Sequence, residues 1–173
     1  LRNEFKKRGI NKQAVTVVTQ VEVSADDPAF EKPAKPVGSF LDEETAKERM
    51  ALGQDFVEDA GRGWRRVVPS PLPMNIVEVD AIKGLIEGGF SVIAVGGGGI
   101  PVVEKENGDL RGVEAVIDKD FASGLLANNL NADLLIISTA VEKIAINFGK
   151  DNEEWLDEMT VAEAEKYIAE GHF

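Results

Sequence analysis

The 173-residue sequence contains no cysteine and a single histidine, His172, at the next-to-last position. The absence of thiols excludes disulfide bonds and thiolate-bound metal sites. One histidine near the end of the sequence also argues against a catalytic triad or a metal centre built on imidazoles. Any chemistry must therefore use backbone groups, hydroxyls, carboxylates, lysines and arginines.

Long apolar stretches are also missing. No run approaches the roughly 18 residues that cross a bilayer, and the opening "LRNEFKKRGI" lacks the apolar region of a signal peptide. We therefore expect a cytoplasmic protein that does not span a membrane.

Positive charge is scarce, with 19 lysines and arginines against 31 aspartates and glutamates, a net charge of −12. Such a chain is not expected to bind nucleic acid or anionic membranes. If it handles a phosphate, it must do so with backbone N–H groups and a few well-placed cationic side chains.

The two ends of the sequence both predict helices. Leu1 and Phe5 followed by Gly9 are typical of the last turns of an amphipathic helix, which predicts that the chain is a piece of a longer one. Near the other end, Thr160 and Glu163 form a capping-box pattern before an apolar-periodic segment that stops at Gly171.

Between the ends, strand and helix patterns alternate, which predicts an α/β fold with a parallel sheet covered by helices. The predicted elements are a strand over 14–23, helices over 77–87 and 121–130 (Phe121, Ala122, Leu125, Leu126 and Leu130 facing inward), and buried strands over 90–95 and 134–141. Ligands of such sheets bind at the carboxyl ends of the strands, here Gly96–Gly99 and Ser138–Val141.

Residues 24–74 interrupt this alternation, because six of the seven prolines lie there around a short predicted helix at 43–52. The pattern fits a lid or small subdomain between proline-rich hinges, and it equally fits a long surface loop.

Four consecutive glycines, Gly96–Gly99, end the predicted strand in "VIAVGGGGIPVV". They match neither the P-loop nor the dinucleotide-binding fingerprint, since no Lys-Ser or Lys-Thr follows and "IPVV" does not open a helix. The run fits a turn whose N–H groups contact an anion. The alternative is a tight turn whose glycines allow close packing.

Asp118, Lys119 and Asp120 stand where the predicted helix 121–130 begins. Aspartates stabilise this end of a helix, whereas a lysine there is mildly unfavourable unless an anion joins it. Lys119 with the helix N-terminus could therefore bind a transferring phosphoryl group. In the other interpretation, the aspartates neutralise a solvent-facing lysine.

Three further segments carry weaker signals. Ser138 and Thr139 end a predicted strand, and the loop around Asn147 could complete a nucleotide site, although most such segments are simple connections. Lys35 lies between two prolines on a stiffened loop. The arginines of "EDAGRGWRR" fit a solvated loop with ion pairs.

Taken together, these stretches resemble carbamate kinases, of the amino acid kinase superfamily. The resemblance rests on "KPVGSFL", "EDAGRGWRRVVPSP", "GGGGIPVV", "GVEAVIDKDFAS", "INFGK" and "GHF", which occur in the family's order. It implies a three-layer αβα sandwich with a protruding subdomain at 24–74, a homodimer, and phosphoryl transfer between ATP and carbamate.

The resemblance also implies residue roles. Lys119 would be catalytic, oriented by Asp118 and Asp120, with Mg²⁺ and ATP or ADP as cofactors. The other implied sets are a carbamate or carbamoyl phosphate site (Gly96, Gly97, Gly98, Gly99, Ile100 and Lys35) and a nucleotide site (Ser138, Thr139, Ala140, Val141, Asn147 and Phe148). No protein group is expected to be a dedicated metal ligand.

The family's two early glycine loops, of the "GGNA" and "GNGPQ" types, and its later lysine segment have no counterpart here. We therefore expect the middle and later part of a kinase chain of roughly 300 residues. Two alternatives stay open: a catalytically incompetent nucleotide-binding fragment, and a sister kinase acting on another carboxylate or on UMP.

Overall fold

The computed structural model describes residues 1–59 and 61–172, so Ala60 and Phe173 of the quoted motifs lie outside the described residues. The chain divides into two compact units, Leu1–Leu135 and Ile136–Phe173. Each unit is described by itself. No helix among the described residues has the length and hydropathy needed to cross a membrane.

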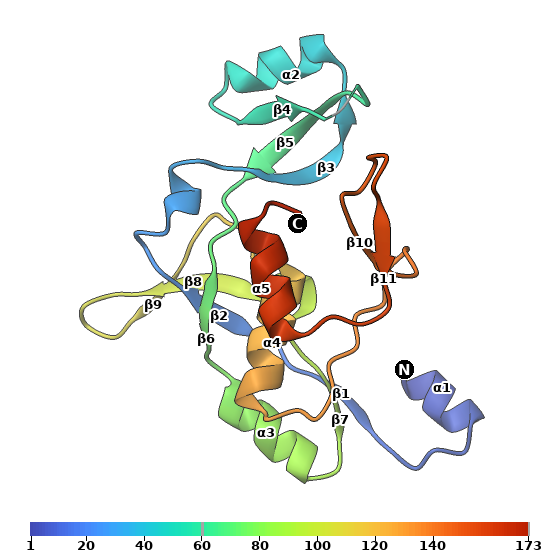
Figure 1. The fold of residues 1–173 in the computed structure, drawn as a ribbon. Coiled ribbons are helices and arrows are strands. Elements are labelled where there is room, and N and C mark those ends of the chain that lie inside the picture. The colour runs from blue at the N-terminus through green and yellow to red at the C-terminus, as the bar shows by residue number, and fades with distance from the viewer. Residues whose placement is uncertain (60, 173) are drawn as a thin grey trace. The chain divides into compact units, whose positions relative to one another are not determined.

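The first unit is built on a four-stranded sheet of order β6-β2-β8-β9 (Figure 1). The central strands β2 (Gln20–Val23) and β8 (Ile100–Glu104) are parallel, while β6 (Pro73–Ile76) and β9 (Leu110–Gly112) join as antiparallel edges. A second parallel pair links β1 (Ala14–Thr16) to β7 (Ser91–Ile93). The parallel pairs agree with the α/β prediction.

One predicted strand, 14–23, is two strands in the structure. Residues 17–19 separate β1 from β2, and Val18 is 72% exposed. The break follows from pairing, because β1 bonds to β7 whereas β2 bonds to β6 and β8.

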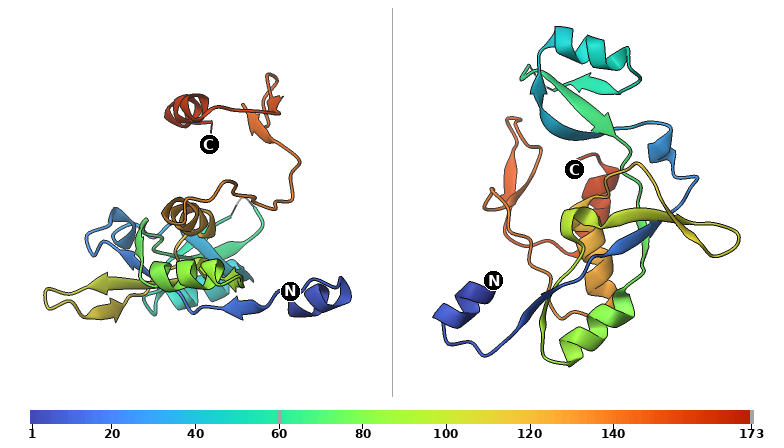
Figure 2. Two further views of the ribbon diagram at one scale, coloured as in Figure 1. Left: turned by 90° about the horizontal axis from the view of Figure 1, so that it is seen from below. Right: turned by 180° about the vertical axis from the view of Figure 1, so that it is seen from behind.

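Outside residues 24–74, the described α-helices of this unit are α1 (Arg2–Lys7), α3 (Val79–Glu87) and α4 (Lys119–Asn129). Helix α4 packs over the sheet (Figure 2, left) and buries Ala122 completely. Leu125, Leu126 and Leu130 pack partly against the same core. The prediction that Phe121 faces inward is wrong: it is 59% exposed, because its direction lies about 100° around the helix from Ala122.

Residues 24–74 leave the sheet after β2 and return at β6, which is paired with β2. In between they form an antiparallel sheet of order β3-β5-β4, from β3 (Lys35–Leu41), β4 (Phe56–Glu58) and β5 (Trp64–Val68), with α2 (Glu43–Met50). Ala46, Phe56 and Val67 are its buried apolar residues. The excursion therefore has secondary structure and buried side chains of its own.

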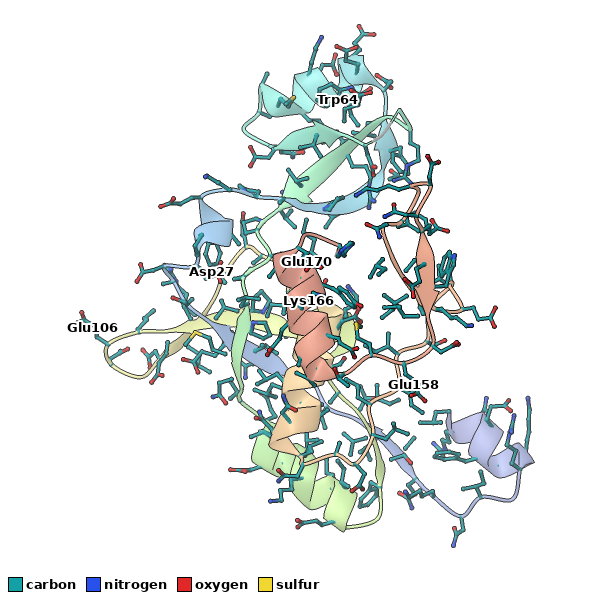
Figure 3. All side chains as sticks on the ribbon, viewed as in Figure 1. Asp27, Trp64, Glu106, Glu158, Lys166 and Glu170 are labelled. Atoms are coloured by element: carbon teal, nitrogen blue, oxygen red, sulfur yellow. The ribbon has the colours of Figure 1, made fainter. Side chains whose placement is uncertain are left out.

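Asp27 joins the two ends of this excursion. Its carboxylate caps the short 3₁₀ helix η1 (Pro28–Phe30) by accepting from Ala29 N at 2.8 Å, and its other oxygen accepts from Leu72 N at 3.0 Å. In Figure 3, Asp27 lies near the main sheet, whereas Trp64 lies in the outer sheet. One side chain thus ties the outgoing chain to the returning chain.

The second unit contains the antiparallel pair β10 (Ile144–Ile146) and β11 (Glu154–Leu156), followed by α5 (Val161–Ala169). Thr160 and Glu163 form the predicted capping box. The predicted strand over 134–141, which begins at the end of the first unit, is absent: these residues are irregular, and Leu134 and Ile136 are 72% and 78% exposed. A strand requires hydrogen bonds to a neighbouring strand, and none of the described strands pairs with this run.

Replacement of Asp27 by alanine removes both the cap and the bond to Leu72. We expect the free energy of unfolding, measured in urea, to fall by about 1–2 kcal/mol. Asp26→Ala is the matched control, because that side chain is exposed and has no partner in the described part of the chain. An equal loss in both variants would contradict the role given to Asp27.

Candidate anion site at the glycine turn

The four glycines lie between β7 and β8: Gly96–Gly98 form a single 3₁₀ turn, η2, and Gly99 is its C-cap residue. Three of them have φ values in the left-handed region, from +74° to +101°. Val95, just before the turn, also has a left-handed backbone (φ +48°, ψ +30°), which is rare and strained for a β-branched residue. The predicted turn between strands is confirmed.

Close packing explains the last two glycines. A Cβ atom on Gly98 would clash with the carbonyl oxygen of Ile117, and one on Gly99 would clash with the Val21 side chain. Gly96 and Gly97 are different: both are exposed, and a Cβ atom on either would meet nothing within 4 Å. The packing interpretation therefore accounts for Gly98 and Gly99 and leaves the other two open.

The backbone N–H groups divide in the same way. Gly98 N donates to Val95 O at 2.9 Å and Gly99 N to Gly96 O at 3.2 Å. The N–H groups of Gly96 and Gly97 have no acceptor among residues 1–59 and 61–172. Two exposed donors on an open turn can bind the oxygens of an anion.

The turn lies against the start of α4, because Gly98 contacts Ile117 and Asp118 is the N-cap residue. Asp118 Oδ1 accepts from Asp120 N at 2.9 Å and from Phe121 N at 3.4 Å. Lys119 is the first residue of the helix and is exposed. The glycine turn, a helix N-terminus and Lys119 therefore belong to one local surface of the first unit.

Neither flanking aspartate forms an ion pair with Lys119 in the described structure, which speaks against the interpretation that they neutralise this lysine. The Lys119 ammonium group has no hydrogen bond or ion pair there, and neither does the Asp120 carboxylate. The Asp118 carboxylate instead accepts hydrogen bonds from the backbone of α4 and from Lys35.

Lys35 reaches this surface from the excursion. Its Nζ lies 2.6 Å from Asp118 Oδ2, a contact between residues 83 positions apart. The hydrogen bond from Lys35, with those from the backbone of Asp120 and Phe121, lowers the pKa of Asp118 despite partial burial. The first residue of β3 is thus held at the start of α4.

The candidate nucleotide residues belong to the second unit. Ser138, Thr139, Ala140 and Val141 are exposed in the irregular run described above. Asn147 has a left-handed backbone (φ +53°), and its N–H donates to His172 Nδ1 at 3.2 Å. Phe148 packs edge-on against Trp155 with ring centroids 6.1 Å apart.

Two features of the structure were not predicted from the sequence. Trp155 is the aromatic partner of Phe148, and Thr19 is a buried residue bonded to the glycine turn. The signal for Thr19 was a polar residue in the valine-rich stretch "AVTVVTQVEV". The expected ion pairs of the arginines occur: Arg62 and Arg65 pair with Asp59, at 2.7 and 3.7 Å, and both lie over the Phe40 ring. The expected solvated loop is wrong for Arg65 and Arg66, which belong to β5.

A dedicated metal site is not apparent, since no group of three or more acidic or histidine side chains gathers among the described residues. Mg²⁺ usually binds through one or two carboxylates together with substrate phosphates, so isolated carboxylates would be sufficient to hold it. Asp120 is the available carboxylate, because both oxygens of Asp118 already accept hydrogen bonds.

Comparison with known proteins connects this geometry to a family. The model of the amino acid kinase family matches residues 8–172. The chain is 57% identical over its whole length to the carbamate kinase-like protein YqeA of Escherichia coli, covering 56% of that protein, and 56% identical to a carbamate kinase of Thermococcus kodakarensis, covering 54%. It spans about half the length of the curated relatives it matches.

Solved structures give the same result. A Giardia lamblia carbamate kinase bound to citric acid superposes with a TM-score of 0.89 at 46% identity, over 99% of this chain and 54% of that one. The same enzyme bound to AMP-PNP gives 0.82 at 47%, over the same shares. The fold-class prediction is confirmed.

The Gly98 contact predicts a difference between neighbouring glycines. Gly98→Ala should lower the free energy of unfolding by about 2–5 kcal/mol, because left-handed strain adds to a clash with the Ile117 carbonyl. Gly97→Ala, with a similar backbone and no clash, should cost about 1–2 kcal/mol. Urea unfolding of both variants tests this, and equal losses would exclude the packing role of Gly98.

The Lys35–Asp118 pair predicts a pH dependence. Because folding lowers the pKa of Asp118, its contribution to stability is complete above the unfolded pKa, about 3.9, and is lost as the pH falls through the folded value. Asp118→Asn keeps an N-cap residue but removes the charge. We expect the variant to be less stable than the wild type at pH 7, with the difference shrinking below pH 4.

Lys35→Met is the partner variant, since it leaves Asp118 without its cation. Its stability should fall less steeply below pH 4 than that of the wild type, as measured by urea unfolding at a series of pH values. Parallel pH profiles for wild type and both variants would show that the pair contributes nothing.

Proposed function

Because the chain belongs to the amino acid kinase family, we propose that it acts in a carbamate kinase, which transfers a phosphoryl group reversibly between ATP and carbamate. In the catabolic direction, ADP and carbamoyl phosphate give ATP and carbamate. The relatives named carbamate kinase support this at 53% to 58% identity. The observation that carries it is the pair of free N–H groups on Gly96 and Gly97 beside Lys119.

Phosphoryl transfer requires mainly positioning and neutralisation of charge, which this set of groups can supply. The N–H groups of Gly96 and Gly97 hold oxygens of carbamate or of the phosphoryl group. Lys119 neutralises the charge that develops during transfer, assisted by the N-terminus of α4. Gly98, Gly99 and Ile100 fix the turn on the sheet.

Residues 24–74 act as the protruding subdomain in this proposal. The subdomain brings Lys35 to the phosphate side of the site, where Asp118 already holds its ammonium group. When carbamoyl phosphate binds, Lys35 turns from Asp118 toward the phosphate oxygens, and Asp118 keeps its bonds to the α4 backbone.

The second unit contains the residues proposed to bind the nucleotide. Ser138, Thr139, Ala140, Val141, Asn147 and Phe148 bind ATP or ADP, which fits the AMP-PNP complex of the Giardia lamblia enzyme. Asp120 would be the protein group that holds a Mg²⁺ ion through water, and the ion would neutralise phosphate charge. A homodimer in the cytoplasm completes the proposal and rests on the family resemblance.

One observation favours a second candidate. The apolar run at 134–137 is exposed and irregular, although its composition is that of a buried strand. The alternative is a nucleotide-binding polypeptide of the same fold that lacks catalysis by itself. Binding of ADP without formation of ATP would identify it.

The test is ATP formation from ADP and carbamoyl phosphate, measured with a coupled assay. Lys119→Ala should lower kcat by about 10²-fold or more, because a charge on the transferring group is left unneutralised. Lys83→Ala is the matched control, an exposed lysine on α3, and should retain wild-type activity. Full activity in folded Lys119→Ala would contradict the role of Lys119.

A further inference from the structure

Val95, the residue just before the glycine turn, has a backbone conformation that is unfavourable for its side chain. Val95 is buried, β-branched and left-handed (φ +48°, ψ +30°). Such a conformation persists only where neighbouring groups fix it, and strain of this kind is concentrated at functional sites. The neighbouring group here is Thr19.

Thr19 bonds to both ends of the turn. Its hydroxyl accepts a hydrogen bond from Val95 N at 2.9 Å and donates one to Val17 O at 3.0 Å. The two bonds together fix the orientation of the hydroxyl group. Its carbonyl accepts from Ile100 N at 2.8 Å, on the far side of the glycines. Thr19 is 4% exposed, and it is the one polar residue that is buried among the described residues.

These bonds determine where the free donors point. The plane of the peptide between Val95 and Gly96 follows from the ψ of Val95, so the Gly96 N–H direction is set by the left-handed backbone that Thr19 holds. An ordinary extended ψ at Val95 would turn that plane by roughly 100°. The following Gly97 N–H would move with it.

We propose that Thr19 is a positioning residue, whose hydroxyl holds Val95 in the left-handed conformation and thereby aims the Gly96 and Gly97 N–H groups at an oxyanion. Thr19 touches no substrate and acts through the turn. The inference rests on the proposed function for the identity of that oxyanion, a carbamoyl or phosphoryl oxygen.

The experiment compares Thr19→Val, which keeps the shape and removes the hydroxyl, with Thr19→Ser, which keeps the hydroxyl. Inorganic phosphate is titrated into ¹⁵N-labelled protein, well below each variant's melting temperature, while the amide signals of Gly96 and Gly97 are followed. We expect saturable shifts at both glycines in wild type and Thr19→Ser. In Thr19→Val the phosphate Kd should rise by about tenfold or more.

Three results would overturn the inference: no phosphate-dependent shift at the two glycines of the wild type, wild-type affinity in Thr19→Val, or equal weakening in Thr19→Ser. A purely structural role would lower the melting temperature of Thr19→Val and leave the Kd unchanged. ATP formation is measured separately on the same samples. Phosphate binding at the glycines without ATP formation would refute the proposed kinase activity while leaving the positioning role supported.

Discussion

The close approach of Gly98 to the carbonyl group of Ile117 is the contact on which the site depends. Because Gly98 has no side chain, the turn after β7 lies directly against the residue that precedes α4. Two sources of positive potential, exposed N–H groups and a helix N-terminus, thus become neighbours. Lys119 adds a full charge at the same place, which matters in a chain of net charge −12.

The start of α4 also joins the excursion to the rest of the first unit. Asp118 caps the helix with one oxygen and binds Lys35 with the other, so one carboxylate serves a local and a distant contact. The pair is partly exposed, with 22% and 36% of the two side chains accessible, and an ion pair in that environment stabilises weakly. A contact of that strength can exchange for a phosphate oxygen, as the proposed movement of Lys35 requires.

Local signals predicted local structure well. The capping box of Thr160 and Glu163, the aspartates at the start of a helix and the turn at Gly96–Gly99 are properties of a few adjacent residues, and the structure contains all three. Pairings between distant segments were not predictable in the same way. The break inside 14–23 arises because its halves bond to different strands, and the Lys35–Asp118 contact joins residues 83 positions apart.

The failure over 134–141 has the same physical basis. Apolar composition indicates that a segment would be buried if a partner existed, but strand structure comes from backbone bonds to that partner. The described residues provide none. Thr19 was missed because its partner does exist but is distant in the sequence. Its hydroxyl accepts a hydrogen bond from Val95, 76 positions away, and composition and spacing cannot reveal such a bond.

The central claim is that the glycine turn and the start of α4 form one oxyanion site. The most direct test is a crystal structure with tungstate, whose anomalous scattering locates the anion without reference to the surrounding atoms. The account predicts a tungstate peak within hydrogen-bonding distance of the backbone nitrogens of Gly96 and Gly97, with Lys119 turned toward it. A well-ordered turn with no anomalous peak there, at a tungstate concentration that saturates other sites, would contradict it.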